Sequence, residues 1–409
     1  MKISIIPLMG LLLSSLSAQS ISTNPAVTPS ENLAPGLTIP VDSPSFVFSP
    51  ANWTGDEGRV GKKFRQSWNP YAYFRVVWES SKTNPSATIL LDTSGLSPAY
   101  PPPSLAYCID GVWRAPVAST NEICLPEIGG SGAHTLEVHL VGSQQRQRWG
   151  SDGTSGLNVV RVTGLRVDAG STPLPGNPAH KWALIIGDSI TEGSGTSALC
   201  PYSHLLGRAL RTRGYEYGIS ACGYSGWLKS GDQDGDVPGY YMITASTNGN
   251  GGRFEDTLSR WNKIDGNRHP LLDTQGHLSA NGETGQEPSL ILINYGTNDF
   301  LRKSNTSDLI ASITRCLAAL RAAAPDARIV LLLPFGQYEA SEIRTALANH
   351  RLENPADTKT DILDLGAGLA RNLENKNGPL GGLHPNDRGH AMIAAELIPR
   401  ILTIVDSSK

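Results

Sequence analysis

The first half of the chain alternates apolar and polar residues in short runs. Such runs occupy residues 72–78, 87–91, 134–140 and 159–162, and turn residues separate them. Alternation with a period of two is typical of strands that bury one face. Several such strands joined by regular turns indicate a β-sandwich. We therefore predict a β-sandwich domain, jelly-roll-like, over residues 46–170.

The second half has a different pattern, in which apolar residues form continuous runs without alternation. These runs lie at 182–187, 290–295, 329–333 and 361–365. Helical segments are expected at 202–213, 307–324 and 385–405. Unbroken apolar strands that alternate with helices are typical of a parallel sheet covered on both faces. We predict a flavodoxin-like, three-layer α/β/α domain over residues 180–409, after a Gly- and Pro-rich connector at 168–180.

The N-terminus reads as an export signal. Lys2 precedes a short apolar run at 5–13, and small residues follow up to Ala18. That run is too short to cross a bilayer, so we predict a signal peptide at 1–18, with a linker or lead-in strand at 19–45. A buried N-terminal strand is the alternative. The expected location is secreted or periplasmic.

Composition narrows the possible partners. Charged residues make up 17% of the chain, and the net charge is -3 without long blocks of one sign. These values favour neither a nucleic-acid partner nor a membrane partner. No Cys/His spacing resembles a zinc site. We expect neither a metal nor a cofactor, and the sequence does not define the oligomeric state.

Five cysteines in an exported chain suggest disulfide pairing with one thiol left over. Cys108 and Cys124 are one possible pair. We predict a bond between Cys200 and Cys222, because both flank strand-end loops of one sheet. Cys316 falls on an expected helix and is expected to be a buried thiol.

Ligands of open α/β sheets bind at the carboxyl ends of the strands, so the polar residues there are candidates for chemistry. Ser189 follows the first apolar strand in the segment G-D-S-I-T-E-G, and a serine there can serve as a nucleophile or as a helix cap. His384 stands in G-L-H-P-N-D, where Pro385 fits the first turn of a helix. Its alternative is an ordinary surface or core histidine.

Two further segments offer hydrogen-bond donors. Gly223 and Gly226 lie in C-G-Y-S-G-W, where a glycine N–H can approach a developing oxyanion or simply form a turn. Asn298 lies in G-T-N-D, and its amide can donate to an oxyanion or cap the next helix.

These four segments, in this order, resemble the SGNH (GDSL-like) hydrolase superfamily over Lys181 to Lys409. The resemblance implies that Ser189 is the nucleophile and His384 the general base. It also implies that the N–H groups of Ser189 and Gly226 and the amide of Asn298 form the oxyanion hole. Gly226 matches the family glycine better than Gly223 does.

One position departs from the family pattern. The family usually carries an aspartate three residues before the histidine, whereas this chain has Gly381. Some carbohydrate esterases of this class use a Ser–His pair with a backbone carbonyl, and they often carry an N-terminal β-sandwich. We expect a carbonyl near Gly381 to orient His384, with Asp364 as a possible relay. Asp387 is expected to point away.

The architecture therefore resembles family 2-like carbohydrate esterases, which implies removal of O-acetyl groups from an oligosaccharide or polysaccharide. Trp227, Phe300 and Trp261 are expected to line the substrate cleft, because aromatic faces suit sugar rings. Trp261 lies in a long insertion at 228–288, whose alternative is a peripheral helix around 253–264. The segment 135–167 is expected to face the esterase domain, or to be an exposed polar hairpin.

Two other functions remain possible at this stage. The absent aspartate would fit a carbohydrate-binding protein whose esterase domain is weak or inactive. The serine and histidine would equally serve an esterase or thioesterase that acts on small or lipid acyl groups.

Overall fold

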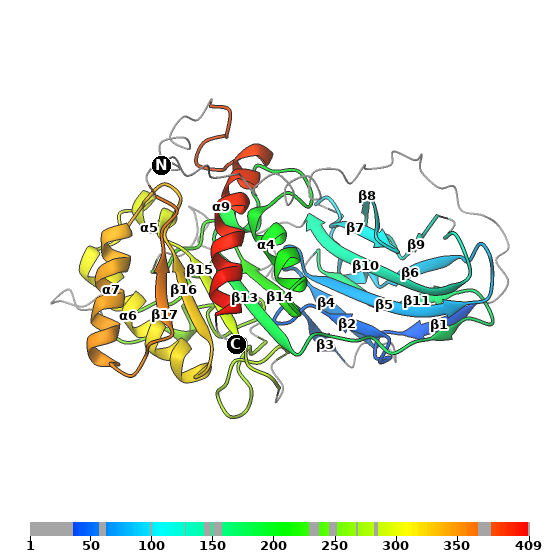
Figure 1. Cartoon of the computed structure of the whole chain (residues 1–409), viewed down its shortest axis with the longest axis horizontal. Coiled ribbons are helices and arrows are strands. Elements are labelled where there is room, and N and C mark those ends of the chain that lie inside the picture. Colours follow the sequence, from blue (N-terminus) through cyan, green and yellow to red (C-terminus); the bar gives the residue numbers. More distant parts are fainter. Residues whose placement is uncertain are drawn as a thin grey trace, which may run out of the picture.

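The computed structural model contains an N-terminal sandwich of strands followed by an α/β domain (Figure 1). It describes residues 36–56, 63–98, 100–126, 128–142, 149, 158–228, 237–244, 252–266, 269–281, 285–366 and 378–407. The predicted signal peptide lies outside the described residues. Within them, no helix is both long and apolar enough to span a bilayer.

The sandwich consists of two antiparallel sheets within the described residues, as predicted. The first sheet comprises β1 (Leu37–Pro40), β3 (Thr54–Asp56), β4 (Phe64–Ser67), β6 (Ala87–Leu91), β9 (Glu122–Cys124) and β11 (Val160–Val167). The second comprises β2 (Phe46–Phe48), β5 (Tyr73–Ser80), β7 (Ser104–Ile109), β8 (Val112–Ala118), β10 (Gly132–Gly142) and β12 (Thr172–Pro173). β1 lies inside the segment expected to be a linker or lead-in strand.

The alternating residues of the long strands build the core of the sandwich. On β5, Phe74, Val76 and Trp78 are at most 1% exposed and face the other sheet, whereas Arg75 and Val77 between them are partly exposed and Glu79 after them is exposed. This alternation is the pattern from which the strands were predicted.

The second domain is built on a parallel sheet in the order β14-β13-β15-β16-β17. Its strands are β13 (Lys181–Gly187), β14 (Tyr215–Ala221), β15 (Leu290–Asn294), β16 (Arg328–Leu332) and β17 (Thr360–Leu363). Numbered along the chain, this order is 2-1-3-4-5, which is the flavodoxin-like arrangement. Its switch point lies between β13 and β15, the strands that precede Ser189 and Asn298.

Helices cover both faces of this sheet. They are α3 (Ser189–Glu192), α4 (Tyr202–Arg211), α5 (Thr297–Leu301), α6 (Thr306–Ala323), α7 (Ala340–Glu353) and α9 (Asp387–Asp406). On β13, Leu184 and Ile186 face the core under α6 and α7, whereas Ala183 and Ile185 face the core under α4 and α9. Two-sided burial explains why this strand is apolar without alternation, and it confirms the predicted three layers.

The two domains share an extensive polar contact along β14, the edge strand of the parallel sheet. The side chain of Asn52 pairs with the backbone of Ile219, since its Nδ2 donates to the carbonyl at 3.0 Å and its Oδ1 accepts from the N–H at 3.3 Å. Tyr73 and Arg75 of the sandwich both donate to Glu216. The sandwich thereby covers a sheet edge that would otherwise expose unpaired backbone groups.

Some expectations for the connecting segments were wrong. No helix spans 253–264, where the structure has only a short 3₁₀ turn, η2 (Asp256–Leu258). Sequence reasoning missed α7, because its polar residues leave only a weak apolar stripe. None of the five cysteines forms a disulfide, so the predicted Cys200–Cys222 bond is absent. Cys222 is fully buried in the α/β domain, whereas Cys200 is only partly buried in the loop before α4.

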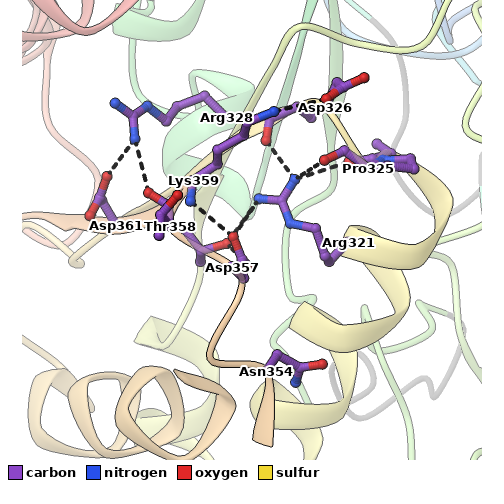
Figure 2. A network of polar contacts seen from close by, with 12 residues as sticks. Arg321, Pro325, Asp326, Arg328, Asn354, Asp357, Thr358, Lys359 and Asp361 are labelled. Atoms are coloured by element: carbon purple, nitrogen blue, oxygen red, sulfur yellow. Dashed lines mark hydrogen bonds and ion pairs between the residues drawn. The ribbon is translucent and has the colours of Figure 1, made fainter. Parts of the chain in front are cut away.

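A polar network closes the amino ends of β16 and β17 (Figure 2). Asp357 forms an ion pair with Arg321 at 3.0 Å and accepts a hydrogen bond from Thr360 Oγ1 at 2.6 Å. His350, whose side chain is fully buried, lies 2.8 Å from the same carboxylate. This network is at the end of the sheet opposite the predicted catalytic residues.

Candidate active site

Ser189 and His384 meet at the carboxyl edge of the parallel sheet. Ser189 follows β13 as the first residue of α3, and Asp188 caps that short helix by accepting from the N–H of Ile190 at 2.9 Å. His384 comes from the loop before α9, and its Nε2 lies 2.8 Å from Ser189 Oγ. A hydrogen bond of this length between a hydroxyl and an imidazole is the geometry that proton transfer between them requires.

Backbone contacts hold His384 in this position. A β-bridge joins Gly381 to Pro385, and the N–H of Asn386 donates to the carbonyl of Leu380 at 2.9 Å. Gly381 has φ +85°, and a Cβ there would lie 2.7 Å from both the His384 carbonyl oxygen and the Asn386 nitrogen. The tight turn therefore requires glycine where the family has aspartate. Gly195 packs against the other side, 3.2 Å from His384 Cβ when given a Cβ of its own.

The carboxylates considered as orienters of His384 are engaged elsewhere. Asp387 accepts hydrogen bonds from the N–H and the hydroxyl of Ser197, at 2.6 and 2.7 Å, and points away from His384 as expected. Asp364 pairs with Arg344 and Gln337. Among the described residues, no carboxylate and no carbonyl accepts a hydrogen bond from Nδ1 of His384, so the expected carbonyl contact is not found there.

Two donors lie on the segments that follow β14 and β15, the strands on either side of β13. Asn298, in α5, is 7% exposed, and its Nδ2 donates one hydrogen to the carbonyl of Ser225 at 2.9 Å. The second hydrogen of that nitrogen has no acceptor among the described residues. Gly226 follows Ser225 directly, so this bond ties the two oxyanion candidates to each other.

Asp299 fixes the backbone around Gly226. Its Oδ2 accepts from the N–H of Trp227 at 2.8 Å, and its Oδ1 accepts from the N–H of Leu228 at 3.0 Å. A Cβ on Gly226 would lie only 2.5 Å from Asp299 Oδ2. Glycine is therefore required at this position by the close approach of the carboxylate.

Burial shifts the pKa values of two groups at the carboxyl edge of the parallel sheet. Desolvation lowers the pKa of His384, although the residue keeps access to solvent, and a lowered pKa favours the neutral base near pH 7. Desolvation also raises the pKa of fully buried Asp188 to about 7, despite the hydrogen bond from Ile190, and the charges of Asp299 and Glu192 add to this rise. Within the described ranges, no group of three or more His, Cys, Asp or Glu residues is arranged to hold a metal.

The aromatic residues expected in the substrate cleft fall into two classes. Trp227 is 1% exposed and Trp261 is 8% exposed, and both rings pack in the core beneath the sheet edge. The expectation that these two tryptophans line the substrate cleft is therefore wrong, because side chains buried in the core cannot stack on a sugar ring. Phe300 is 50% exposed and stacks on Tyr338 with 4.7 Å between ring centroids. It remains a candidate contact.

Sequence reasoning did not identify Arg260, which lies fully buried beneath the candidate site. An isolated arginine in a polar insertion carries no pattern that distinguishes it from a surface residue. Asp299 belongs to the G-T-N-D segment, but nothing in the sequence assigns its hydrogen bonds to the loop of Gly226.

Comparisons with known proteins agree with this arrangement. The GDSL-like Lipase/Acylhydrolase family matches residues 185–392, which is half of the chain and contains every candidate catalytic residue. The chain belongs to this family, and the family assignment makes it an ester hydrolase. A search of curated protein sequences found no significant match.

Solved structures extend the likeness to both domains. A family two carbohydrate esterase from Clostridium thermocellum, solved with cellohexaose, covers 88% of this chain and 99% of its own, at 16% identity and a TM-score of 0.59. The acetyl xylan esterase Est2A from Butyrivibrio proteoclasticus covers 91% and 99%, at 16% identity and a TM-score of 0.62. The salicylyl-acyltransferase SsfX3 of a tetracycline biosynthetic pathway covers 90% and 98%, at 15% identity and a TM-score of 0.55. At these identities the likeness concerns the fold.

Proposed function

We propose that this protein is a serine esterase that removes O-acetyl groups from a carbohydrate, with Ser189 as nucleophile and His384 as general base. The observation that carries the proposal is the 2.8 Å contact between Ser189 Oγ and His384 Nε2. The two-domain likeness to family two carbohydrate esterases supports the choice of substrate class.

The mechanism has two halves. Ser189 Oγ attacks the acetyl carbonyl while His384 Nε2 accepts the hydroxyl proton, and the same proton then passes to the departing sugar oxygen. Water attacks the acetyl-serine, His384 accepts one of its protons, and acetic acid leaves as that proton returns to Ser189; the acid then ionises to acetate in solvent. The chemistry of these steps is general base catalysis through a covalent intermediate, and it balances without a further reactant.

The tetrahedral intermediates carry a negative oxygen that needs donors. We assign this role to the N–H groups of Ser189 and Gly226 and to the second amide hydrogen of Asn298. Each donor of this kind contributes typically about 3–4 kcal/mol to the transition state. The pairing of Asn298 with the carbonyl of Ser225 supports the assignment, because it fixes two of the three donors relative to one another.

The test is acetate release from a panel of acetylated polysaccharides, measured for the wild type and for Ser189→Ala. The proposal expects release from at least one polysaccharide and none above background for the variant. A p-nitrophenyl ester series that prefers long acyl chains, with no acetate from any polysaccharide, would instead indicate a lipid esterase. Sugar binding without hydrolysis of any ester would indicate a carbohydrate-binding protein.

Export is a separate proposal, which rests on the charged, apolar and small residues of the first 18 positions. N-terminal sequencing of the mature protein tests it, and we expect the mature chain to begin after Ala18. A mature protein that retains Met1 would contradict export through a cleaved signal.

A further inference from the structure

Arg260 is a fully buried cation that has no ion-pair partner among the described residues. Its guanidinium instead donates to neutral oxygens. Nη2 reaches the carbonyls of Gly187 and Ser220, at 3.2 and 3.0 Å, and also the hydroxyl of Tyr295. Nη1 reaches the hydroxyl of Ser220 at 3.2 Å, and Nε reaches that of Ser225 at 3.3 Å.

Desolvating a buried charge is costly, and within the described residues only neutral oxygens accept hydrogen bonds from Arg260, so its position calls for an explanation. Its acceptors share one location, the carboxyl edge of the sheet. Gly187 ends β13 two residues before Ser189, Ser220 lies at the end of β14, and Tyr295 follows β15. Arg260 therefore joins the ends of the three strands that carry the candidate active site.

Ser225 connects Arg260 to the oxyanion donors. Its hydroxyl accepts from Arg260 Nε and donates to the carbonyl of Pro238 at 2.9 Å, which uses both kinds of hydrogen bond that a hydroxyl can form. Its own carbonyl accepts from Asn298 Nδ2, and the next residue is Gly226. Ser225 therefore links the guanidinium of Arg260 to both oxyanion donors, Gly226 and Asn298.

The sandwich domain contributes to the same cluster through Trp149. The ring centroid of Trp149 lies 5.1 Å from the guanidinium carbon of Arg260, within the range of a cation–π contact. Trp149 is 5% exposed and packs with Cys222 and Val237 of the α/β domain. One residue of the segment expected to face the esterase domain is thus buried directly against Arg260.

We propose that Arg260 is a positioning residue for the oxyanion site, and that Trp149 of the sandwich holds its guanidinium in place. The inference rests on the proposed esterase function. Arg260 acts by fixing the loop of Ser225 and Gly226 against Asn298, so its loss weakens transition-state binding more than substrate binding. The sandwich is then part of the catalytic scaffold as well as a neighbouring domain.

A double-mutant cycle on the full chain tests the proposal, with p-nitrophenyl acetate as substrate. Arg260→Met should lower kcat by about 30-fold and change KM by less than about threefold. Asn298→Ala should lower kcat by about 100-fold, and the double variant should be at most about threefold slower than Asn298→Ala alone. Non-additivity of this kind reports that two residues act through one element. A double variant whose loss equals the product of the single losses would overturn the proposal.

Two other substitutions keep the test valid if Arg260→Met does not fold. Ser225→Ala removes the hydroxyl that accepts from Arg260 Nε and donates to the carbonyl of Pro238, and we expect kcat to fall about tenfold with KM unchanged. Trp149→Leu removes the cation–π contact, and we expect kcat to fall about fivefold. Unchanged kcat in both variants would overturn the proposal.

Trp113→Leu is the matched control for Trp149→Leu. Trp113 is 6% exposed, belongs to β8 of the sandwich, and lies 5.5 Å from the guanidinium carbon of Arg208 on α4. Trp113→Leu therefore removes a similar contact between the domains at a place away from the loop of Ser225 and Gly226, and kcat should stay at the wild-type value. An equal loss of kcat in both tryptophan variants would show a general effect of domain packing. Failure of the esterase function itself would appear separately, as activity that survives Ser189→Ala.

Discussion

Two histidines at opposite ends of the parallel sheet are held in different ways. At the amino end, His350 is fully buried and lies 2.8 Å from Asp357, which Arg321, Thr360 and the N–H of Lys359 also contact. At the carboxyl end, His384 contacts Ser189, and no described carboxylate lies within hydrogen-bond distance of its ring. The sheet thus carries a histidine–aspartate pair, but not where a catalytic triad would need one.

The difference teaches what each pair does. A buried carboxylate with a histidine and an arginine around it fixes structure, because leaving any one partner unpaired is costly. A histidine that must exchange protons with Ser189 and with a substrate needs an open face instead. Here the turn from Gly381 to Pro385 orients the ring through the backbone. In a triad one aspartate supplies both orientation and charge stabilisation, whereas the contacts described around His384 here are those of the backbone turn and of Ser189.

The largest expected effects come from the carboxyl end. Ser189→Ala and His384→Ala should each lower kcat/KM for p-nitrophenyl acetate by at least about 10³-fold, because each removes a partner of the proton transfer. Neither side chain is part of a core, so the melting temperatures should stay within a few degrees of wild type. The matched variant is His350→Ala, which should behave in the opposite way and lose stability but little kcat/KM. Activity of Ser189→Ala above about 10% of wild type would exclude Ser189 as nucleophile.

The second prediction addresses the amino end. Burial alone would raise the pKa of Asp357, but hydrogen bonds from Thr360, His350 and Arg321 outweigh burial and hold that pKa well below its usual value. The ionised carboxylate therefore stabilises the fold above the ordinary aspartate pKa, and this contribution is lost as the pH falls through the lowered value. Asp357→Ala should lower the free energy of unfolding at pH 7 by about 3 kcal/mol.

Urea unfolding and steady-state kinetics check this prediction together. The expected result is a lower urea midpoint with kcat within about twofold of wild type, assayed below the melting temperature. Asp326→Ala is the control, because its carboxylate is exposed and pairs with Lys359 at the surface, where such pairs contribute little to stability. Equal losses in both variants would mean that burial of the network contributes little.

The sequence predicted the residues of the candidate active site better than the contacts that support them. Strand ends and short polar segments are local features, so the sequence places Ser189, Asn298 and His384 at one edge of one sheet. Trp227 and Trp261 were misplaced because an aromatic residue near a site looks the same in sequence whether it faces a sugar or the core. Arg260 was missed for a related reason, since only tertiary contacts distinguish a buried arginine from an exposed one.

The third prediction tests the turn that replaces the aspartate. Gly381→Ala should lower kcat about tenfold and destabilise the fold by about 2 kcal/mol, because a side chain there meets both a positive φ and backbone atoms at 2.7 Å. Gly276→Ala separates the two causes. Gly276 has φ +87°, and a Cβ there would meet nothing within 4 Å, so this substitution should cost about 1 kcal/mol and leave kcat unchanged. Wild-type kcat in Gly381→Ala would show that His384 does not depend on this turn.

The smallest effect concerns the pH dependence of catalysis. In the proposed mechanism the neutral form of His384 is the base, so kcat/KM should fall as the pH drops through the pKa of this residue. Desolvation lowers that pKa below 6.5, and no described carboxylate raises it again, so the acid limb of the profile should lie below pH 6.5. Asp188, the residue before Ser189, is a second group whose pKa, about 7, falls in this range. Asp188→Asn keeps an acceptor for the helix cap and removes this second titration. If kcat/KM of Asp188→Asn still falls only below pH 6.5, the titrating group is His384. A fall that begins above pH 7 in that variant would instead indicate that a carboxylate raises the pKa of the histidine.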